Sequence, residues 1–165
     1  MAEKMAQEKT EANESSLKAL NIMVKKVITI NEESSVKEAA EVMNRFEIGS
    51  IIAVKKGMAT GIITERDLLK RIVAEERNAK NVRVRDIMST PLVSITSETE
   101  LEKAALLMFQ KKIKKLPVVD RRRLVGIISL TDIARSESMM GFLQKLAERR
   151  DPPKNIKKVL NSYIV

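Results

Sequence analysis

The chain of 165 residues contains neither cysteine nor histidine. Without cysteine, disulfide bonds, thiolate metal sites and a cysteine nucleophile are excluded. Without histidine, the chain lacks the commonest general base, the commonest transition-metal ligand and the serine–histidine triad. Carboxylate and lysine chemistry remain open, but the composition favours a binding protein over an enzyme. We therefore expect no catalytic residues and no metal site.

Aromatic residues and long apolar runs are also scarce. The chain has three Phe, one Tyr and no Trp. No apolar run approaches the roughly 20 residues that a membrane span needs. The first nine residues lack the apolar core of a signal peptide. These absences predict a cytoplasmic protein with no membrane partner.

Basic residues exceed acidic residues, and the formal net charge is +9. Three interpretations remain open: a solvated basic surface, an anionic ligand such as a nucleotide, or a polyanion such as nucleic acid.

Most of the chain is a tandem repeat. Between Ile22 and Asp67, 13 of 46 positions recur identically 65 residues later. Chance identity at about one position in 16 would give about three matches. Two copies of one supersecondary unit therefore make up most of the protein, and each copy ends in the same hydroxyl-x-x-carboxylate motif.

The repeats divide the chain into four parts. Residues 1–15 are polar and are expected to form a flexible tail. The first repeat is placed at 16–78, and the second at 79–136 with a linker at 79–85. Residues 137–165 are expected to form a helical extension, with a first amphipathic helix that ends at the prolines of 151–153.

Each repeat predicts the order β-α-β-β-α. Apolar strands are expected at 27–30 and 92–95. The helices that follow have apolar residues spaced three and four apart, and Ser34, Ser35 or Thr99 is expected to cap them. Two hairpins come next, with strands at 50–54, 61–63, 116–119 and 124–128. A second helix begins at Thr64 or Ser129, and its apolar face in the first copy is Leu68, Leu69, Ile72 and Val73.

The expected fold class is α/β (α+β in some schemes). One copy alone cannot bury both faces of so small a sheet, whereas two copies packed about a pseudo-two-fold axis can.

The repeated motif has two interpretations. Thr64-x-x-Asp67 and Ser129-x-x-Asp132 match a helix capping box, which a single occurrence would favour. However, Asp is shorter than the Glu that best closes such a box, and the motif is duplicated while the residues inside it are not. A carboxylate beside a crevice can accept two hydrogen bonds from the vicinal diol of a ribose. The hydroxyl and the helix amides would then suit a phosphate.

The chain resembles a tandem pair of cystathionine β-synthase (CBS) domains, also called a Bateman module, over residues 17–136. The motifs that carry the resemblance are residues 22–23, 86–88 and 116–120 and the two Gly-Ile-Ile-Thr/Ser-x-x-Asp elements. The resemblance implies a non-catalytic sensor that needs no cofactor. It would bind AMP, ADP, ATP or S-adenosylmethionine in two clefts between the repeats. It also implies a homodimer, shaped as a flat disc, that acts on an effector protein in trans.

The resemblance implies two sets of nucleotide-binding residues. Cleft 1 would be formed by Ser34, Ala39, Ile48, Ser50, Lys114, Lys115, Ser129, Thr131 and Asp132. Cleft 2 would be formed by Thr64, Arg66, Asp67, Thr99, Ala104 and Ile113.

Within these sets the implied roles differ. The two aspartates would bind ribose hydroxyls, and the hydroxyl and basic residues would face phosphate. The base would lie against Ala39, Ala104, Ile48 and Ile113. An alternative for Lys114 and Lys115 is a solvated strand edge that lysine protects against mispairing.

A basic turn, Arg121–Arg123, departs from the neutral or acidic turn usual in this family. With Lys111, Lys112, Lys114 and Lys115 it concentrates positive charge in the second repeat. It is either a solvated hairpin tip or a polyanion-binding patch, and the second alternative predicts a nucleic-acid-associated protein. The scarcity of aromatic residues argues against sequence-specific binding of single strands.

Overall fold

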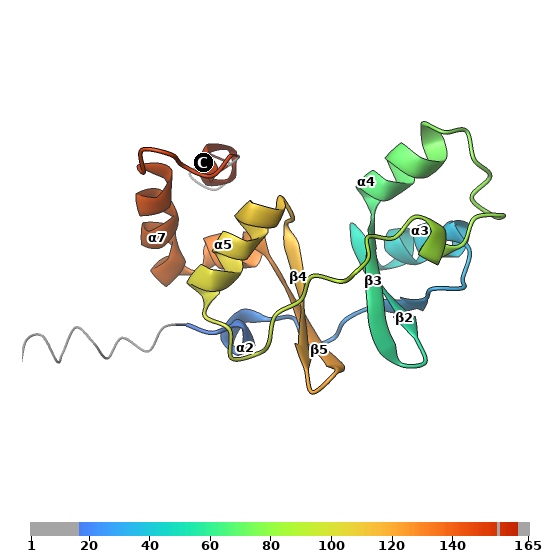
Figure 1. Cartoon of the computed structure of the whole chain (residues 1–165), viewed down its shortest axis with the longest axis horizontal. Coiled ribbons are helices and arrows are strands. Elements are labelled where there is room, and N and C mark those ends of the chain that lie inside the picture. Colours follow the sequence, from blue (N-terminus) through green and yellow to red (C-terminus); the bar gives the residue numbers. More distant parts are fainter. Residues whose placement is uncertain (1–16, 155, 162–165) are drawn as a thin grey trace, which may run out of the picture.

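The computed structural model describes residues 17–154 and 156–161, which form two small α/β units joined side by side (Figure 1). The first unit holds a three-stranded sheet in the order β1-β2-β3. Its strands are β1 (Thr29–Asn31), β2 (Ser50–Lys55) and β3 (Met58–Thr64). β1 runs parallel to β2, and β2 runs antiparallel to β3. The second unit holds the antiparallel hairpin of β4 (Lys115–Asp120) and β5 (Arg123–Ser129).

Helices cover these sheets in the predicted order. α3 (Val36–Phe46) follows β1, and α4 (Glu65–Leu68) follows β3 and continues as a π-helical turn, η1 (Leu69–Val73). The second unit has α5 (Leu101–Lys111) and α6 (Leu130–Arg135) at the corresponding places. The remaining helices are α2 (Ala19–Ile22), the 3-10 turn η2 (Val84–Asp86), α7 (Glu137–Ala147) and α8 (Ile156–Asn161).

Local signals explain where α3 begins. Ser35 is the N-cap residue, and its hydroxyl accepts a hydrogen bond from the backbone N–H of Glu38 at 3.2 Å. The Glu38 carboxylate in turn accepts a hydrogen bond from the Ser35 N–H at 2.7 Å, which closes a capping box. The buried face of the helix is Val36, Ala39 and Met43, at the predicted helical spacing.

Two local predictions for the second unit are wrong. The strand expected at 92–95 is reduced to a single bridge, in which Ile95 pairs with Val118. Thr99 does not cap α5, because the N-cap position is Glu100. The Thr99 hydroxyl instead accepts a bond from the backbone N–H of Thr96 at 3.1 Å, which stabilises the preceding turn.

The two units exchange their entry segments. Residues 17–24 begin the first repeat but pack on the second, where Val24 and Ile127 exchange backbone hydrogen bonds of 2.9 and 3.0 Å. Residues 82–89 lie at the start of the second repeat but pack on the first, where Ser89 and Ile62 pair in the same way. Val82 and Val84 are buried in the first core, so the segment expected as a linker is structural. The exchange ties the two repeats together.

The second helix of the first repeat buries fewer residues than predicted. Ile72 is buried, but Leu69 and Val73 are 61% and 65% exposed. They lie on the outer side of α4–η1, away from the sheet. In the second repeat the counterpart of Leu69 is Ala134, which is 2% exposed because it shares a core with Met139 and Leu143 of α7.

The described part of the C-terminal extension thus packs on the second repeat. α7 ends at Ala147, before the predicted stop at 151–153, and α8 adds the buried Ile156. Predictions for residues 1–15, Tyr163 and Ile164 lie outside the described residues. Among the described helices, none is both long enough and apolar enough to cross a bilayer.

Candidate functional site

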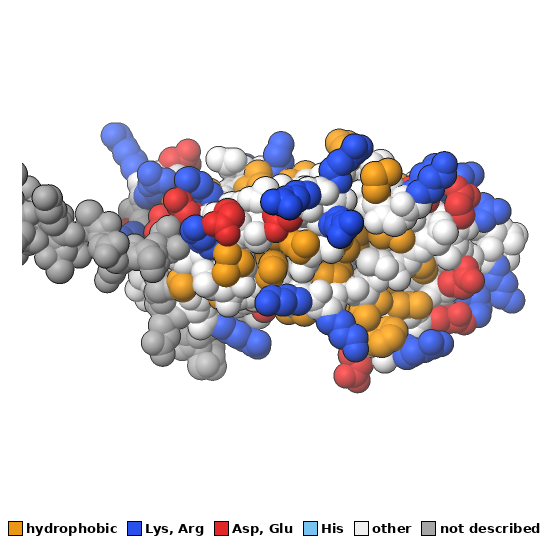
Figure 2. Space-filling model, turned by 90° about the horizontal axis from the view of Figure 1, so that it is seen from below, with side chains coloured by type: hydrophobic (Ala, Val, Ile, Leu, Met, Phe, Trp, Pro, Cys, Tyr) orange, Lys and Arg blue, Asp and Glu red, His pale blue; other side chains and the backbone are white. Residues whose placement is uncertain are grey.

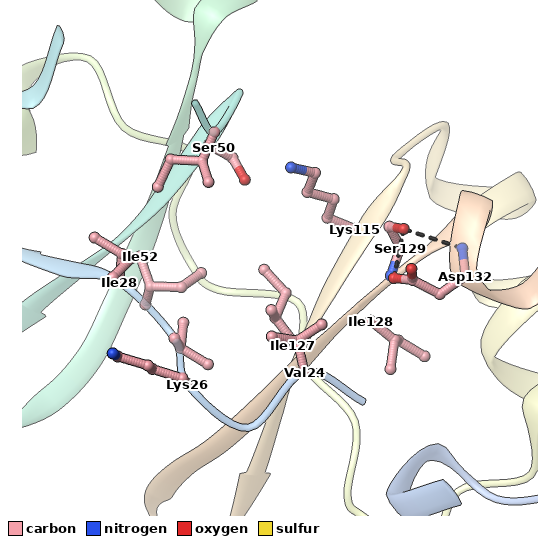
Figure 3. Close-up of a pocket in the computed structure, with 12 residues that line it drawn as sticks. Val24, Lys26, Ile28, Ser50, Ile52, Lys115, Ile127, Ile128, Ser129 and Asp132 are labelled. Carbon is pink, nitrogen blue, oxygen red and sulfur yellow. Dashed lines mark hydrogen bonds between the residues drawn. The ribbon is translucent and has the colours of Figure 1, made fainter. Parts of the chain in front are cut away.

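A cavity of about 220 Å³ lies between the two repeats (Figure 3). One wall comes from the entry segment and the β2 region of the first repeat, and the other from β4, β5 and α6 of the second. The lining residues are Val24, Lys26, Val27, Ile28, Ile48, Ser50, Ile52, Lys115, Ile127, Ile128, Ser129 and Asp132. Both repeats are therefore needed to form it.

Branched aliphatic side chains dominate the walls. Ile28 and Ile52 face Ile127 and Val24 across the cavity in Figure 3. Apolar walls with a few polar groups are typical of small-molecule sites, although such sites usually measure about 300–1,000 Å³. The cavity thus accommodates a nucleoside-sized fragment, and a larger ligand would extend out of it.

Asp132 is the only carboxylate that lines this cavity. Its Oδ2 accepts hydrogen bonds from the Ser129 backbone N–H at 2.8 Å and from the Ser129 hydroxyl at 2.6 Å. The Ser129 hydroxyl in turn accepts a bond from the Asp132 N–H at 3.2 Å, so the two residues form a complete capping box. Oδ1 has no such partner among the described residues and remains an acceptor.

The same box forms in the first repeat. Asp67 Oδ2 accepts from the Thr64 N–H at 2.9 Å and from the Thr64 hydroxyl at 2.7 Å. The capping-box interpretation is therefore confirmed in both repeats: each aspartate, although shorter than glutamate, caps its helix with one oxygen. Capping and ligand binding are compatible because a carboxylate has a second oxygen.

Two lysines and a serine complete the polar lining. Lys26 is exposed and Lys115 is half-buried. In Figure 3, Lys115 reaches from β4 toward Ser50, while the ammonium of Lys26 lies on the side farther from Asp132. Ser50 is only 7% exposed, and its hydroxyl has no hydrogen-bond partner among the described residues. The Ser50 oxygen is therefore accessible from the cavity, where it can bind a ligand atom.

The structure brings together five of the residues predicted for cleft 1: Ile48, Ser50, Lys115, Ser129 and Asp132. The other four lie elsewhere. Ala39 is 0% exposed, within the first core, and cannot present a surface to a base in this structure. The Ser34 carbonyl accepts a bond from Val84 N–H, while Lys114 is exposed and Thr131 half-buried, both outside the lining.

The sequence analysis missed several lining residues, namely Val24, Lys26, Val27, Ile28, Ile52, Ile127 and Ile128. Four of them belong to the exchanged entry segment or continue it toward β1. Repeat alignment alone does not indicate that this segment crosses between the two repeats, so no sequence signal would have identified Lys26.

The cleft 2 residues have different surroundings. Asp67 Oδ1 lies 4.0 Å from the Nε of Arg71, so its second oxygen already faces a guanidinium. Ala104 is 0% exposed in the second core, and Thr99 is engaged with Thr96. Arg66 is exposed and Ile113 half-buried. A ligand site built from these residues stays a prediction.

The basic residues of the second repeat do not form one patch. Lys115 pairs with Ser129 at one end of the β4–β5 hairpin, and Asp120 pairs with Arg123 at the other end. A rise of about 3.4 Å per residue separates the ends by about 17 Å. Figure 2 shows lysine and arginine spread along the length of one face and interrupted by acidic and apolar side chains. No cluster of acidic side chains among the described residues could hold a metal ion.

Comparison with known proteins shows which family the chain resembles. The model of the CBS domain family matches residues 18–74 and 84–138. The CBS domain-containing protein YhcV of Bacillus subtilis (strain 168) is 38% identical over 112 residues, which are 68% of this chain and 79% of YhcV. An uncharacterized protein of Methanopyrus kandleri is 39% identical over 113 residues, 67% of this chain but only 58% of that protein.

A solved structure with a similar fold contains adenosyl ligands. It is the CBS domain pair of protein MJ0100 in complex with 5′-methylthioadenosine and S-adenosyl-L-methionine. The two chains superpose with a TM-score of 0.66 and are 28% identical, and the match covers 73% of this chain and 94% of the other.

Proposed function

The chain belongs to the CBS domain family, and from that premise we propose that it is a non-catalytic regulatory module that binds an adenosine-containing ligand. The site is the cavity between its two repeats. AMP, ADP, ATP and S-adenosylmethionine are the candidate ligands.

One observation carries this proposal: a carboxylate with a remaining acceptor opens on an apolar cavity shared by both repeats. Asp132 Oδ2 holds the helix cap, so Oδ1 is available to a ribose hydroxyl. Ile28 and Ile127, both half-buried, stand on opposite walls and offer apolar surfaces to a flat base. The adenosyl ligands bound to the MJ0100 domain pair support the same ligand class.

Regulation follows from the shared walls. The two repeats can pack in more than one relative arrangement. A ligand stabilises the arrangement in which both walls contact it, because it binds that arrangement more tightly than the other. The exchanged entry segments couple this change to both cores. The proposed output is a change in how the module contacts an effector protein in trans.

The test separates binding from capping. Asp132→Ala removes both a cap and the proposed ribose acceptor, whereas Glu38→Ala removes only the corresponding cap of α3, outside the cavity lining. Each variant is expected to lose about 1 kcal/mol of unfolding free energy. Only Asp132→Ala should weaken adenosyl binding, by about tenfold or more, because hydrogen bonds to charged groups contribute about 1.5–3 kcal/mol.

Isothermal titration calorimetry and urea unfolding measure the two quantities. If Asp132→Ala and the unmodified protein bind the adenosyl ligand with equal affinity, Asp132 acts only as a capping residue. If calorimetry detects no binding of AMP, ADP, ATP, S-adenosylmethionine or 5′-methylthioadenosine, the proposal is wrong.

We also propose a homodimer. Leu69 and Val73 leave an apolar strip on α4–η1 of the first repeat, whereas α7 covers the corresponding surface of the second repeat in the same chain. A second copy can therefore pair with the first-repeat helices, but a disc that also uses the second-repeat helices would have to displace α7.

The nucleic-acid alternative has less support from the geometry. Its basic residues lie at opposite ends of the β4–β5 hairpin, so they form two separate groups and not one continuous basic patch. A mobility assay at two salt concentrations discriminates, because phosphate contacts predict affinity that falls steeply with salt.

A further inference from the structure

The ionisable groups of the cavity are unbalanced in charge. Two lysines, Lys26 and Lys115, and one carboxylate, Asp132, line the cavity, which leaves one excess positive charge. Within the described part of the chain, neither lysine forms an ion pair with an acid. Asp132, moreover, is already held by the Ser129 cap. The unneutralised charge near an apolar cavity favours an anionic ligand.

Ser50 gives a second and independent indication of a bound group. Its side chain is 7% exposed, lines the cavity, and has a hydroxyl without a hydrogen-bond partner among the described residues. In Figure 3 this hydroxyl and the Lys115 side chain approach the same part of the gap between the repeats. A hydroxyl and an ammonium that converge there suit the oxygens of one phosphate.

The internal repeat provides a comparison within the same chain. A shift of 65 residues places Pro91 at the position of Lys26 and Ser50 at the position of Lys115. The counterpart of Asp132 is Asp67, whose second oxygen faces Arg71 at 4.0 Å. The counterpart of Arg71 is Ser136, which carries no charge. The shift exchanges Ser50 and Lys115, so the two sides differ in Lys26, which only the Asp132 cavity has, and in Arg71, which faces Asp67 alone.

We propose that this cavity selects a phosphorylated adenosine over adenosyl thioethers and sulfonium compounds, an inference that rests on the proposed function. Each chain binds one such ligand. Lys115 and Ser50 contact the phosphate nearest the ribose. Lys26, at the far edge, adds longer-range attraction. S-adenosylmethionine places a positive sulfonium where AMP places a phosphate, so the same lysines oppose it.

AMP and 5′-methylthioadenosine form a matched ligand pair, because they differ only in the group on the 5′ carbon. Calorimetry on the full chain should give one AMP per chain and an AMP affinity about 10- to 100-fold higher than that for 5′-methylthioadenosine. S-adenosylmethionine should bind no more tightly than 5′-methylthioadenosine. The preference for AMP should shrink as salt is raised, because salt screens charge but not apolar contact.

Substitution of each lysine by glutamine, which is neutral, measures how much that lysine contributes to AMP affinity. Lys115→Gln should lower AMP affinity about tenfold and Lys26→Gln about threefold, the smaller effect reflecting its exposure. Both should change 5′-methylthioadenosine affinity less than twofold. Lys111→Gln and Lys25→Gln, exposed neighbours outside the cavity, are the matched controls and should retain AMP affinity.

The outcomes distinguish an error in the charge selection from an error in the adenosyl site itself. If 5′-methylthioadenosine or S-adenosylmethionine binds as tightly as AMP, the charge selection is wrong but the adenosyl site stands. A second AMP per chain, or unchanged AMP affinity in Lys115→Gln, overturns the assignment to this cavity. If no adenosyl compound binds, both proposals fail.

Discussion

At the scale of single residues, two glycines allow the exchanged segments to dock. Gly126 lies in β5 beneath Met23, and a Cβ at Gly126 would come 2.6 Å from the Met23 sulfur. Gly61 lies in β3 beneath Met88, where a Cβ would come 2.6 Å from the sulfur and 2.9 Å from the Ser89 carbonyl oxygen. In both repeats, therefore, the absence of a side chain at the glycine makes room for a methionine of the exchanged segment, which can then pack on the sheet of the other repeat.

Alanine at the two glycine positions should destabilise the protein to different extents. Gly126→Ala is expected to cost about 1–3 kcal/mol of unfolding free energy, the usual range for overpacking. Gly61→Ala should cost more, because it also meets backbone that cannot rotate away. Urea unfolding of both variants measures the difference.

Met23→Ala supplies the control, since it empties the space that the new methyl group would enter. In that background Gly126→Ala should lose at least half of its penalty. An unchanged penalty would show that β5 itself, and not the contact with Met23, rejects the side chain.

The residue-level predictions succeeded where a side chain acts on its immediate neighbours. Ser129 and Asp132 could be paired from their spacing, and the structure shows both on the cavity wall. The capping box was one of the two interpretations of this spacing, and the structure shows it in both repeats. Lys26 was missed because nothing in the sequence states which repeat its segment joins.

At the scale of elements, the two hairpin turns have the same backbone but different residues. Lys56 and Gly57 have φ of 49° and 78°, and their counterparts Arg121 and Arg122 have φ of 47° and 67°. Left-handed backbone at both positions is typical of a two-residue type I′ turn, which prefers glycine at the second position. Arg122 therefore holds a conformation that costs a side-chain-bearing residue about 1–2 kcal/mol.

Arg122→Gly should consequently stabilise the protein, by roughly 0.5–1 kcal/mol after the greater entropy of glycine in the unfolded chain is subtracted. Arg123→Gly, which falls at the start of β5, should not, since glycine weakens strands. Denaturant midpoints compare the two variants. A destabilised Arg122→Gly variant would mean that the guanidinium makes contacts worth more than the backbone strain.

The helices and hairpins could be predicted because their periodicity and turn residues are local. The strand at 92–95 could not, because a short apolar segment becomes a strand only if a partner pairs along its length, and here Ile95 alone does so. Likewise, apolar spacing marked Leu69 and Val73 as part of a buried face. Spacing does not say whether the covering surface belongs to the same chain.

At the scale of the whole molecule, the two repeats differ most in what covers their outer helices. The proposed homodimer uses the uncovered strip at Leu69 and Val73. Leu69→Asp should shift the protein toward monomer in sedimentation velocity, because a charge in an apolar interface is costly. Its fold should persist, since Leu69 is 61% exposed.

Met58→Asp is the matched control, an exposed apolar residue of β3 at 45% exposure that lies outside the helices. It should leave the association state unchanged. Dissociation by Met58→Asp and not by Leu69→Asp would move the interface to the hairpin tips.

The tandem architecture followed from the 65-residue repeat, and the family from the motifs within it. The exchange of entry segments and the unequal covering by α7 are tertiary properties. They arise from which apolar surfaces meet after both repeats have formed, and no single-repeat pattern encodes them.

The most direct measurement is the methyl NMR spectrum of isoleucine-labelled protein during titration with AMP, 5′-methylthioadenosine or S-adenosylmethionine. We predict that Ile28 of the first repeat and Ile127 of the second shift together and saturate at one concentration, while Ile133, buried beneath α7, stays in place. Shifts confined to one repeat, or none with any of the three ligands, would contradict an adenosyl site between the repeats.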